Sequence, residues 1–184
     1  MADQHRTHQH RGKTTEGHLD KTAILDNLRI EPGQMVLDAG CGNGFMAKEF
    51  AKLTGPTGKV FALDTDPAAI ESLQSETQGT VIEPFVGDIT TETKLAAASL
   101  DLIFLATVLH GFSQSQLDGF QQEVRRLLKP NGKLAIVEFK PEETPFGPPL
   151  AIRFSPERLQ ITISLTPTRL VEVGEFFYLQ MFEI

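Results

Sequence analysis

The stretch that decides the fold is Val36–Gly44, which reads VLDAGCGNG. Three glycines, Gly40, Gly42 and Gly44, stand at alternate positions after a short apolar run, and a helical pattern follows from Phe45. Glycine lets the backbone turn sharply and lets a ligand approach closely. Free N–H groups at a helix N-terminus attract anions or polar groups. A strand, a glycine loop and a helix in this order predict a nucleotide-type binding site.

The chain on both sides of this loop alternates between strand and helix patterns. Short apolar runs predict strands at 35–39, 59–64, 81–86, 100–107 and 133–139. Helices are expected at 21–28, 45–53, 67–78 and 115–128. Asp20 and Asp66 stand where helix N-caps are expected, and proline follows Asp66 at the first helical position. Apolar strands separated by helices predict an α/β fold: a Rossmann-like, doubly wound sheet, mostly parallel, with helices on both faces.

The last third of the chain is less regular. Residues 140–155 contain four prolines and one glycine, so we expect a loop that is placed as a candidate lid. Ser155-Pro156-Glu157 indicates a helix start, although many residues after it are β-branched. Strands are expected at 169–173 and 176–184, on either side of Gly174.

Two acidic residues lie at the ends of the next two predicted strands. Asp64 lies 20 residues past Gly44, where an acid accepts the ribose hydroxyls of a nucleoside. Asp88 stands in the run VGDI, where it is placed to meet the amine of an adenine; the alternative for both acids is an ordinary turn residue. The carboxyl ends of parallel strands share one sheet edge, so the loop and both acids gather there.

The spacing of the glycines separates two cofactor classes. The NAD fingerprint is G-x-G-x-x-G, whereas this chain has G-x-G-x-G with Asp38 two residues ahead of Gly40. A carboxylate beside a pyrophosphate is unfavourable. S-adenosylmethionine (SAM) carries an ammonium and a sulfonium, which suit a nearby carboxylate. The pattern favours SAM, with an NAD-dependent oxidoreductase as the alternative.

Five stretches in this order make the chain resemble the class I SAM-dependent methyltransferases. They are VLDAGCGNG at 36–44, FALDTDP at 61–67, VGDI at 86–89, LDLIFLATVLHGF at 100–112 and VRRLLKPNGKLAIVEF at 124–139. The chain is most similar to the small-molecule type, which includes ubiquinone/menaquinone C-methyltransferases and arsenite methyltransferases. The resemblance implies seven strands in the order 3-2-1-4-5-7-6 with the last strand antiparallel, SAM as cofactor and S-adenosylhomocysteine as product.

The resemblance also implies a set of cofactor-binding residues. They are Asp38, Gly40, Cys41, Gly42, Asn43, Gly44, Asp64, Thr65, Gly87, Asp88, Ile89, Leu105 and Ala106. Two departures limit the subtype. Arsenite methyltransferases use several cysteines, whereas this chain has one. The Asn/Asp-Pro-Pro-aromatic motif of nucleic-acid amino methylases is absent from 105–108, which read LATV.

The chemistry expected at this site is methyl transfer to a small-molecule acceptor that the sequence does not identify. SAM is already an activated donor, so the protein supplies orientation and water exclusion. A base is needed only when the acceptor loses a proton, and His110 and Glu138 are the candidate catalytic residues. Each also has a structural interpretation, His110 in loop packing and Glu138 in pairing. A non-catalytic SAM-binding module remains a further alternative.

Composition excludes several partner classes. The formal net charge of −7 argues against nucleic acid as a partner. We expect no membrane span, because no apolar run approaches the roughly 20 residues that one needs. The single cysteine suits a cytoplasmic protein. An exposed C-terminal strand would let two copies pair as a homodimer.

The N-terminus differs from the rest of the chain. Residues 1–18 are polar and predict a mobile tail, which leaves 19–184 as the single SAM-binding domain. Four of the five histidines lie in the tail: His5, His8, His10 and His18. Imidazoles bind metals, but no cysteine or carboxylate cluster completes a coordination sphere here, so no metal site is predicted. His18 adjoins the first helix, where it is placed to fold over a cofactor.

Overall fold

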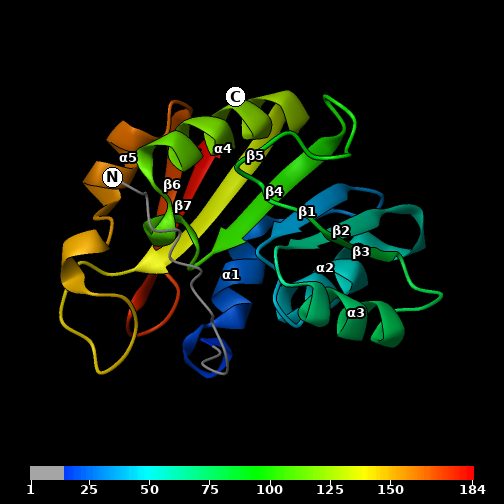
Figure 1. Cartoon of the computed structure of the whole chain (residues 1–184), viewed down its shortest axis with the longest axis horizontal. Helices are drawn as coiled ribbons and strands as arrows, with labels where there is room; N and C mark the ends of the chain where they lie inside the picture. The colour runs from blue at the N-terminus through cyan, green and yellow to red at the C-terminus, as the bar shows by residue number, and fades with distance from the viewer. Residues whose placement is uncertain (1–14) are drawn as a thin grey trace, which may run out of the picture.

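The computed structural model describes residues 15–184 and shows one seven-stranded sheet (Figure 1). The strands are β1 (Met35–Ala39), β2 (Lys59–Asp64), β3 (Ile82–Val86), β4 (Leu100–Ala106), β5 (Leu128–Phe139), β6 (Thr166–Glu172) and β7 (Phe177–Glu183). Their order is β3-β2-β1-β4-β5-β7-β6. The first five strands are parallel, and β7 runs antiparallel between β5 and β6. The predicted Rossmann-like fold and strand order are confirmed.

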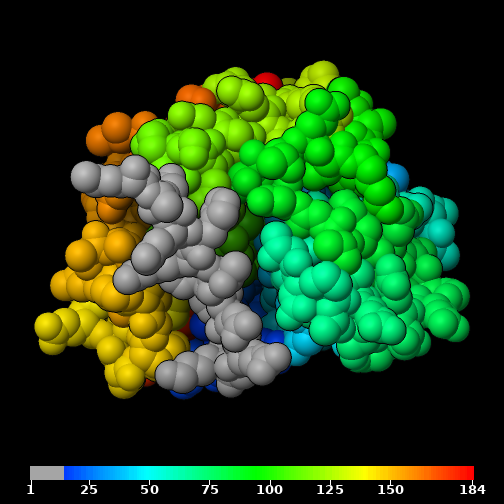
Figure 2. All heavy atoms as spheres, in the orientation of Figure 1, coloured from blue at the N-terminus to red at the C-terminus, as the bar shows by residue number. Residues whose placement is uncertain are grey.

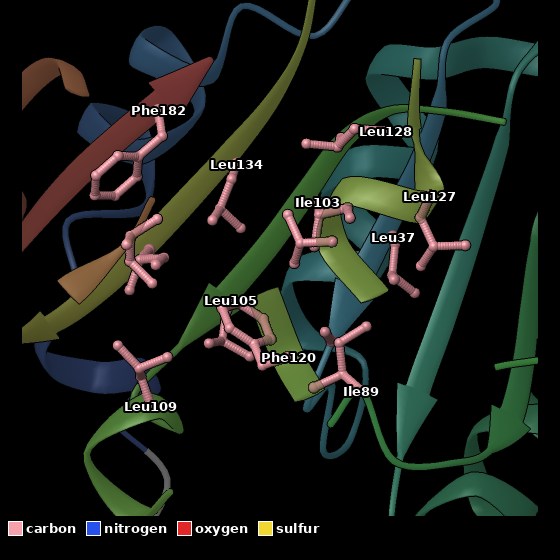
Figure 3. Packing of buried hydrophobic residues seen from close by; sticks show 14 of the residues in the cluster. Leu37, Ile89, Ile103, Leu105, Leu109, Phe120, Leu127, Leu128, Leu134 and Phe182 are labelled. Carbon is pink, nitrogen blue, oxygen red and sulfur yellow. The ribbon is translucent and has the colours of Figure 1, made fainter. Parts of the chain in front are cut away.

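Within residues 15–184, five α-helices cover the two faces of this sheet. They are α1 (Lys21–Leu28), α2 (Phe45–Thr54), α3 (Pro67–Glu76), α4 (Gln114–Leu127) and α5 (Pro156–Thr162). Alternate strand residues point to opposite faces, which divides the core into two clusters. One cluster packs under α1, α2 and α3, and the other under α4 and α5. Figure 3 shows Phe120 and Leu127 of α4 among strand residues of the second cluster, such as Leu105 and Ile103.

The helix starts follow from capping side chains. Asp20 accepts a hydrogen bond from Ala23 N at 2.9 Å, and Asp66 accepts one from Ala68 N at 2.9 Å. Each bond satisfies a backbone N–H that has no partner within its own helix. Ser155 caps α5, which confirms the predicted start despite the β-branched residues, because α5 buries Leu159 against the sheet.

Two details of the predicted sheet were wrong. The fifth strand begins at Leu128, not at Lys133, because the Pro130-Asn131-Gly132 turn forms an irregularity inside the strand, with Asn131 at φ 65°. The C-terminal strand β7 is buried between two neighbours rather than exposed. The edge strand on that side is β6, so a homodimer through this edge stays a prediction.

The described part of the predicted tail packs against the domain. Glu16–His18 form a short 3₁₀ turn, and the His18 ring lies 4.3 Å from the Phe146 ring, centroid to centroid. His5, His8 and His10 lie outside the described residues, and the division at residue 18 stays a prediction. Over residues 15–184 no group of three metal-ligating side chains comes together, and none of the helices has the length and apolarity to cross a bilayer.

Candidate cofactor and acceptor site

The glycine loop is held against the end of β2. Gly40 N and Cys41 N both donate to the carbonyl of Leu63, at 2.7 and 3.0 Å. Gly40, Gly42 and Gly44 have φ of +76°, +52° and +76°, in the left-handed region where glycine has no steric penalty. Any other residue type at these three positions would strain the backbone of the turn.

The three glycines differ in what surrounds them. A Cβ on Gly40 would lie 2.6 Å from Val108 Cγ2, and a Cβ on Gly44 would clash with Leu73. A Cβ on Gly42 would meet no atom within 4 Å in the described part of the chain. Packing within the protein thus requires glycine at the first and third positions. Within residues 15–184, Gly42 faces open space, through which a ligand would reach the backbone.

Asp64 connects the loop to the neighbouring strand ends. Its carboxylate accepts hydrogen bonds from Gly42 N at 2.8 Å and from Asp66 N at 2.9 Å. Its carbonyl accepts from Gly87 N at 3.0 Å, which joins the ends of β2 and β3. Asp64 therefore has the turn role that was its alternative interpretation, and it also lies beside the open face of Gly42.

Asp38 is a buried acid with an unused oxygen. The residue is 3% exposed, and its Oδ2 is the one buried side-chain nitrogen or oxygen in residues 15–184 that has no hydrogen-bond partner. Burial, opposed by a hydrogen bond from Ala47 N and helped by the charge of Asp64, raises the pKa of Asp38 to about 7. Buried polar atoms rarely lack a partner, so a ligand bound here would find an acceptor in this oxygen.

The other polar residues predicted to bind the cofactor lie around this centre. Asp88 Oδ1 accepts from both the backbone N and the hydroxyl of Thr90, at 2.8 and 2.7 Å. Asn43 Oδ1 accepts from Phe45 N at 3.1 Å and so helps to begin α2. Thr65 is exposed, immediately after β2. Cofactor contacts from these three side chains stay predictions.

The apolar members of the predicted set are mostly buried. Ile89 and Leu105 belong to the core under α4, which leaves mainly their backbone for a cofactor, and Ala106 is half-buried at the end of β4. The thiol of Cys41 is buried, and burial with the charges of Asp38 and Asp64 raises its pKa. A protonated thiol is a poor nucleophile, so Cys41 acts as a small spacer in the loop.

The two candidate catalytic residues form one pair. His110 lies in a 3₁₀ turn after β4, and Glu138 lies near the end of β5. Glu138 Oε2 is 2.9 Å from His110 Nδ1, and Oε1 accepts from His110 N at 3.2 Å. The side chain of Glu138 is 0% exposed, and that of His110 is 9% exposed. This pairing was not predicted from the sequence. The implied adjacency of strands 4 and 5, near whose ends the two residues lie, could have indicated it.

Arg153 organises the proline-rich loop and was not predicted from the sequence. It is 6% exposed, and its guanidinium donates to four backbone carbonyls and to one hydroxyl of the loop. The acceptors are Pro148 O, Lys140 O, Glu142 O, Phe146 O and Thr144 Oγ1. Figure 2 shows this loop, in yellow to orange, on the opposite side of the visible face from α3, in teal.

A family model described as a methyltransferase domain matches residues 36–132, which is more than half of the chain. The matched range begins in β1 and ends inside β5, so it contains the glycine loop, both acids and His110. The chain belongs to the class I SAM-dependent methyltransferases. The cofactor of this enzyme family is SAM rather than NAD, as the glycine spacing predicted.

Relatives of known sequence and structure agree with this assignment. An uncharacterized methyltransferase of Synechocystis sp. is 35% identical over 130 residues, which cover 70% of this chain and 58% of that protein. The ubiquinone/menaquinone biosynthesis C-methyltransferase UbiE of Bordetella avium is 30% identical over 129 residues, covering 70% and 50%. The chain therefore spans about half the length of the curated relatives it matches.

Solved structures match nearly the whole chain. A SAM-dependent methyltransferase from Aquifex aeolicus superposes with a TM-score of 0.83 and 27% identity and covers 94% of both chains. A putative type 11 methyltransferase from Sulfolobus solfataricus reaches 0.74 with 22% identity, covering 89% of this chain and 91% of that one. The second likeness shows the fold alone.

The residues at the strand ends of this methyltransferase fit SAM. A ligand ammonium would satisfy Asp38 Oδ2, the buried oxygen without a donor. Ribose hydroxyls would donate to Asp64, whose carboxylate stands beside Gly42. The open face of Gly42 leaves the space that the ligand needs. These three features are independent of the family match.

Proposed function

We propose that this domain transfers a methyl group from SAM to a small-molecule acceptor. The observation that supports this most strongly is Asp38 Oδ2, a buried carboxylate oxygen without a donor beside an open glycine loop. Relatives named for ubiquinone/menaquinone biosynthesis and for 2-phytyl-1,4-naphtoquinone methylation favour an acceptor of quinone type, taken here in its reduced quinol form. Homodimer formation and a cytoplasmic location stay predictions.

Each group at the site has a role in this proposal. Asp38 holds the ammonium end of SAM, Asp64 accepts from the ribose, and the Gly40–Gly44 loop lets the cofactor lie against the backbone. SAM, when bound, supplies a methyl group on a sulfonium, which is already activated for displacement. The loop over residues 140–154, held by Arg153, excludes water and positions the acceptor.

The cofactor assignment is tested by calorimetric titration of the full chain with SAM, S-adenosylhomocysteine and NAD in parallel. We expect the two adenosyl-sulfur compounds to bind and NAD to give no heat of binding. Binding of NAD alone would overturn the interpretation of the glycine loop. Incubation with SAM carrying a labelled methyl group and a quinol acceptor then tests the transfer itself.

Asp64→Ala is expected to lower SAM affinity by roughly tenfold or more, because it removes a charged acceptor whose hydrogen bonds contribute about 1.5–3 kcal/mol. It also removes the bond that holds Gly42 N. Titration with SAM measures the effect. Asp66→Ala is the matched control, since it removes a neighbouring acid that caps α3. Equal SAM affinity in wild type and Asp64→Ala would contradict the assignment.

A further inference from the structure

The ring and the backbone of His110 are both held by hydrogen bonds to the carboxylate of Glu138. Both carboxylate oxygens of Glu138 contact His110, Oε2 at the ring Nδ1 and Oε1 at the backbone N, and Oε2 also accepts from Phe139 N at 3.4 Å. A carboxylate at Nδ1 holds the proton on that nitrogen. The nitrogen that remains to accept a proton is therefore Nε2. This is the arrangement of a histidine oriented by an acid, in which the acid stabilises the imidazolium once it forms.

The charges around this pair leave Glu138 without another cation. No lysine or arginine of residues 15–184 forms an ion pair with it. On β7, Tyr178 stands opposite Glu138, and its hydroxyl donates to Phe154 O at 2.9 Å. Burial and the charge of Glu138 raise the pKa of Tyr178, so this hydroxyl stays neutral. Among the ion pairs of the described residues, His110 is therefore the one side chain that becomes a cation beside Glu138 when it takes up a proton.

An aromatic ring and a buried guanidinium lie next to the pair. The centroid of the Phe139 ring is 6.2 Å from that of the His110 ring, and Cζ of Arg153 is 5.0 Å from the Phe139 centroid. The hydrogen bonds of Arg153 go to carbonyls and a hydroxyl, none of which carries a negative charge. Once His110 holds the acceptor's proton, its charge and that of Glu138 balance, and the guanidinium of Arg153 then favours an acceptor that becomes anionic over an ammonium.

We infer that His110 takes a proton from the acceptor, that Glu138 positions His110, and that the acceptor is a weakly acidic aromatic hydroxyl compound. The inference rests on the proposed function. The acceptor O–H bond breaks, and its proton goes to Nε2 of His110. An electron pair of the oxygen forms the bond to the methyl carbon, and the pair of the broken C–S bond stays on sulfur as a neutral thioether. His110 then loses the proton to water.

The acceptor class is tested with two acceptors of equal shape, 2-naphthol and 2-naphthylamine, and SAM with a labelled methyl group. We expect labelled methyl ether from 2-naphthol and much less product from the amine. Product from the amine alone, or none from 2-naphthol, would overturn the inference if calorimetry still shows SAM binding. Loss of SAM binding itself would instead count against the proposed function.

The base is tested with His110→Ala. We expect kcat for 2-naphthol to fall roughly 10²–10⁴-fold, the usual contribution of a general base, with the Kd for SAM unchanged. The loss should shrink strongly with 4-nitrophenol in mildly alkaline buffer, where this acceptor is largely ionised and has no proton to give. Equal losses with both acceptors would show that His110 only supports the structure and would overturn the inference.

The positioning role is tested with Glu138→Gln, which keeps the shape of the side chain and removes its charge. We expect kcat for 2-naphthol to fall while KM for 2-naphthol changes little. Glu123→Gln is the matched control, because Glu123 is also buried, at 3% exposed, and pairs with Arg126 on α4 outside the site. Both variants lose a buried charge, so an equal fall in kcat would overturn the role of Glu138.

Discussion

Gly42→Ala is expected to lower SAM affinity by roughly 10- to 100-fold while the domain stays folded. The added methyl group meets no atom of residues 15–184 within 4 Å, so it intrudes on the space left for the ligand. Overpacking a close-fitting site costs about 1–3 kcal/mol, and each 1.4 kcal/mol is tenfold in affinity. Calorimetric titration with SAM measures this loss, and thermal unfolding measures the stability.

Gly55→Ala is the control that distinguishes the effect of backbone strain from the effect of lost ligand space. Gly55 has φ +63°, and its Cβ would also meet no described atom within 4 Å, but it lies at the end of α2, away from the strand ends that form the site. Both substitutions place alanine at a positive φ, and Gly55, with ψ −170°, lies in a region that is almost exclusive to glycine. We expect a loss of stability in both variants, at least as large at Gly55, and a loss of SAM affinity only at Gly42. Equal SAM affinity in the two variants would mean that the loop does not contact the cofactor.

The parts of the site that the sequence predicted are those fixed by local pattern and strand order. Gly40, Gly42 and Gly44 permit the left-handed backbone that the loop adopts, and Asp64 comes at the end of an apolar run. A parallel sheet then brings such strand ends to one edge without further information. The resemblance added the strand order, which no local pattern contains.

The parts that the sequence did not predict depend on side chains from distant segments. The contact of His110 with Glu138 depends on the register in which Ala106 pairs with Val137, and register is not visible in either strand alone. The role of Arg153 was missed because its partners are backbone carbonyls, whose positions no residue type reveals. The turn at 130–132 was expected to precede the strand, but pairing of Leu128 with Leu100 extends the strand across it.

The cofactor-free protein is expected to lose stability as the pH rises from about 4 to about 7 because of Asp38. Its folded-state pKa of about 7 lies above the ordinary value of 3.8 for an aspartate, so the folded state binds more protons than the unfolded state in this window. Stability falls with pH wherever that holds. The contribution of Asp38 to stability is fully present below the pKa of the unfolded state and is lost as the pH rises through the pKa of the folded state. The difference is on the order of 4 kcal/mol.

SAM affinity is expected to change in the opposite direction, because an ammonium binds the ionised carboxylate. Affinity should rise by up to about tenfold per pH unit below the pKa of Asp38 and become constant above it. Asp38→Asn keeps the shape and removes the titration, so the difference between wild type and variant isolates this residue from every other group. Urea unfolding and SAM titration across the pH range measure the two slopes. If Asp38 contacts the ammonium, Asp38→Asn removes both the pH dependence of stability and the pH dependence of SAM affinity. If only the pH dependence of stability disappears, Asp38 Oδ2 has a partner other than the ammonium of SAM.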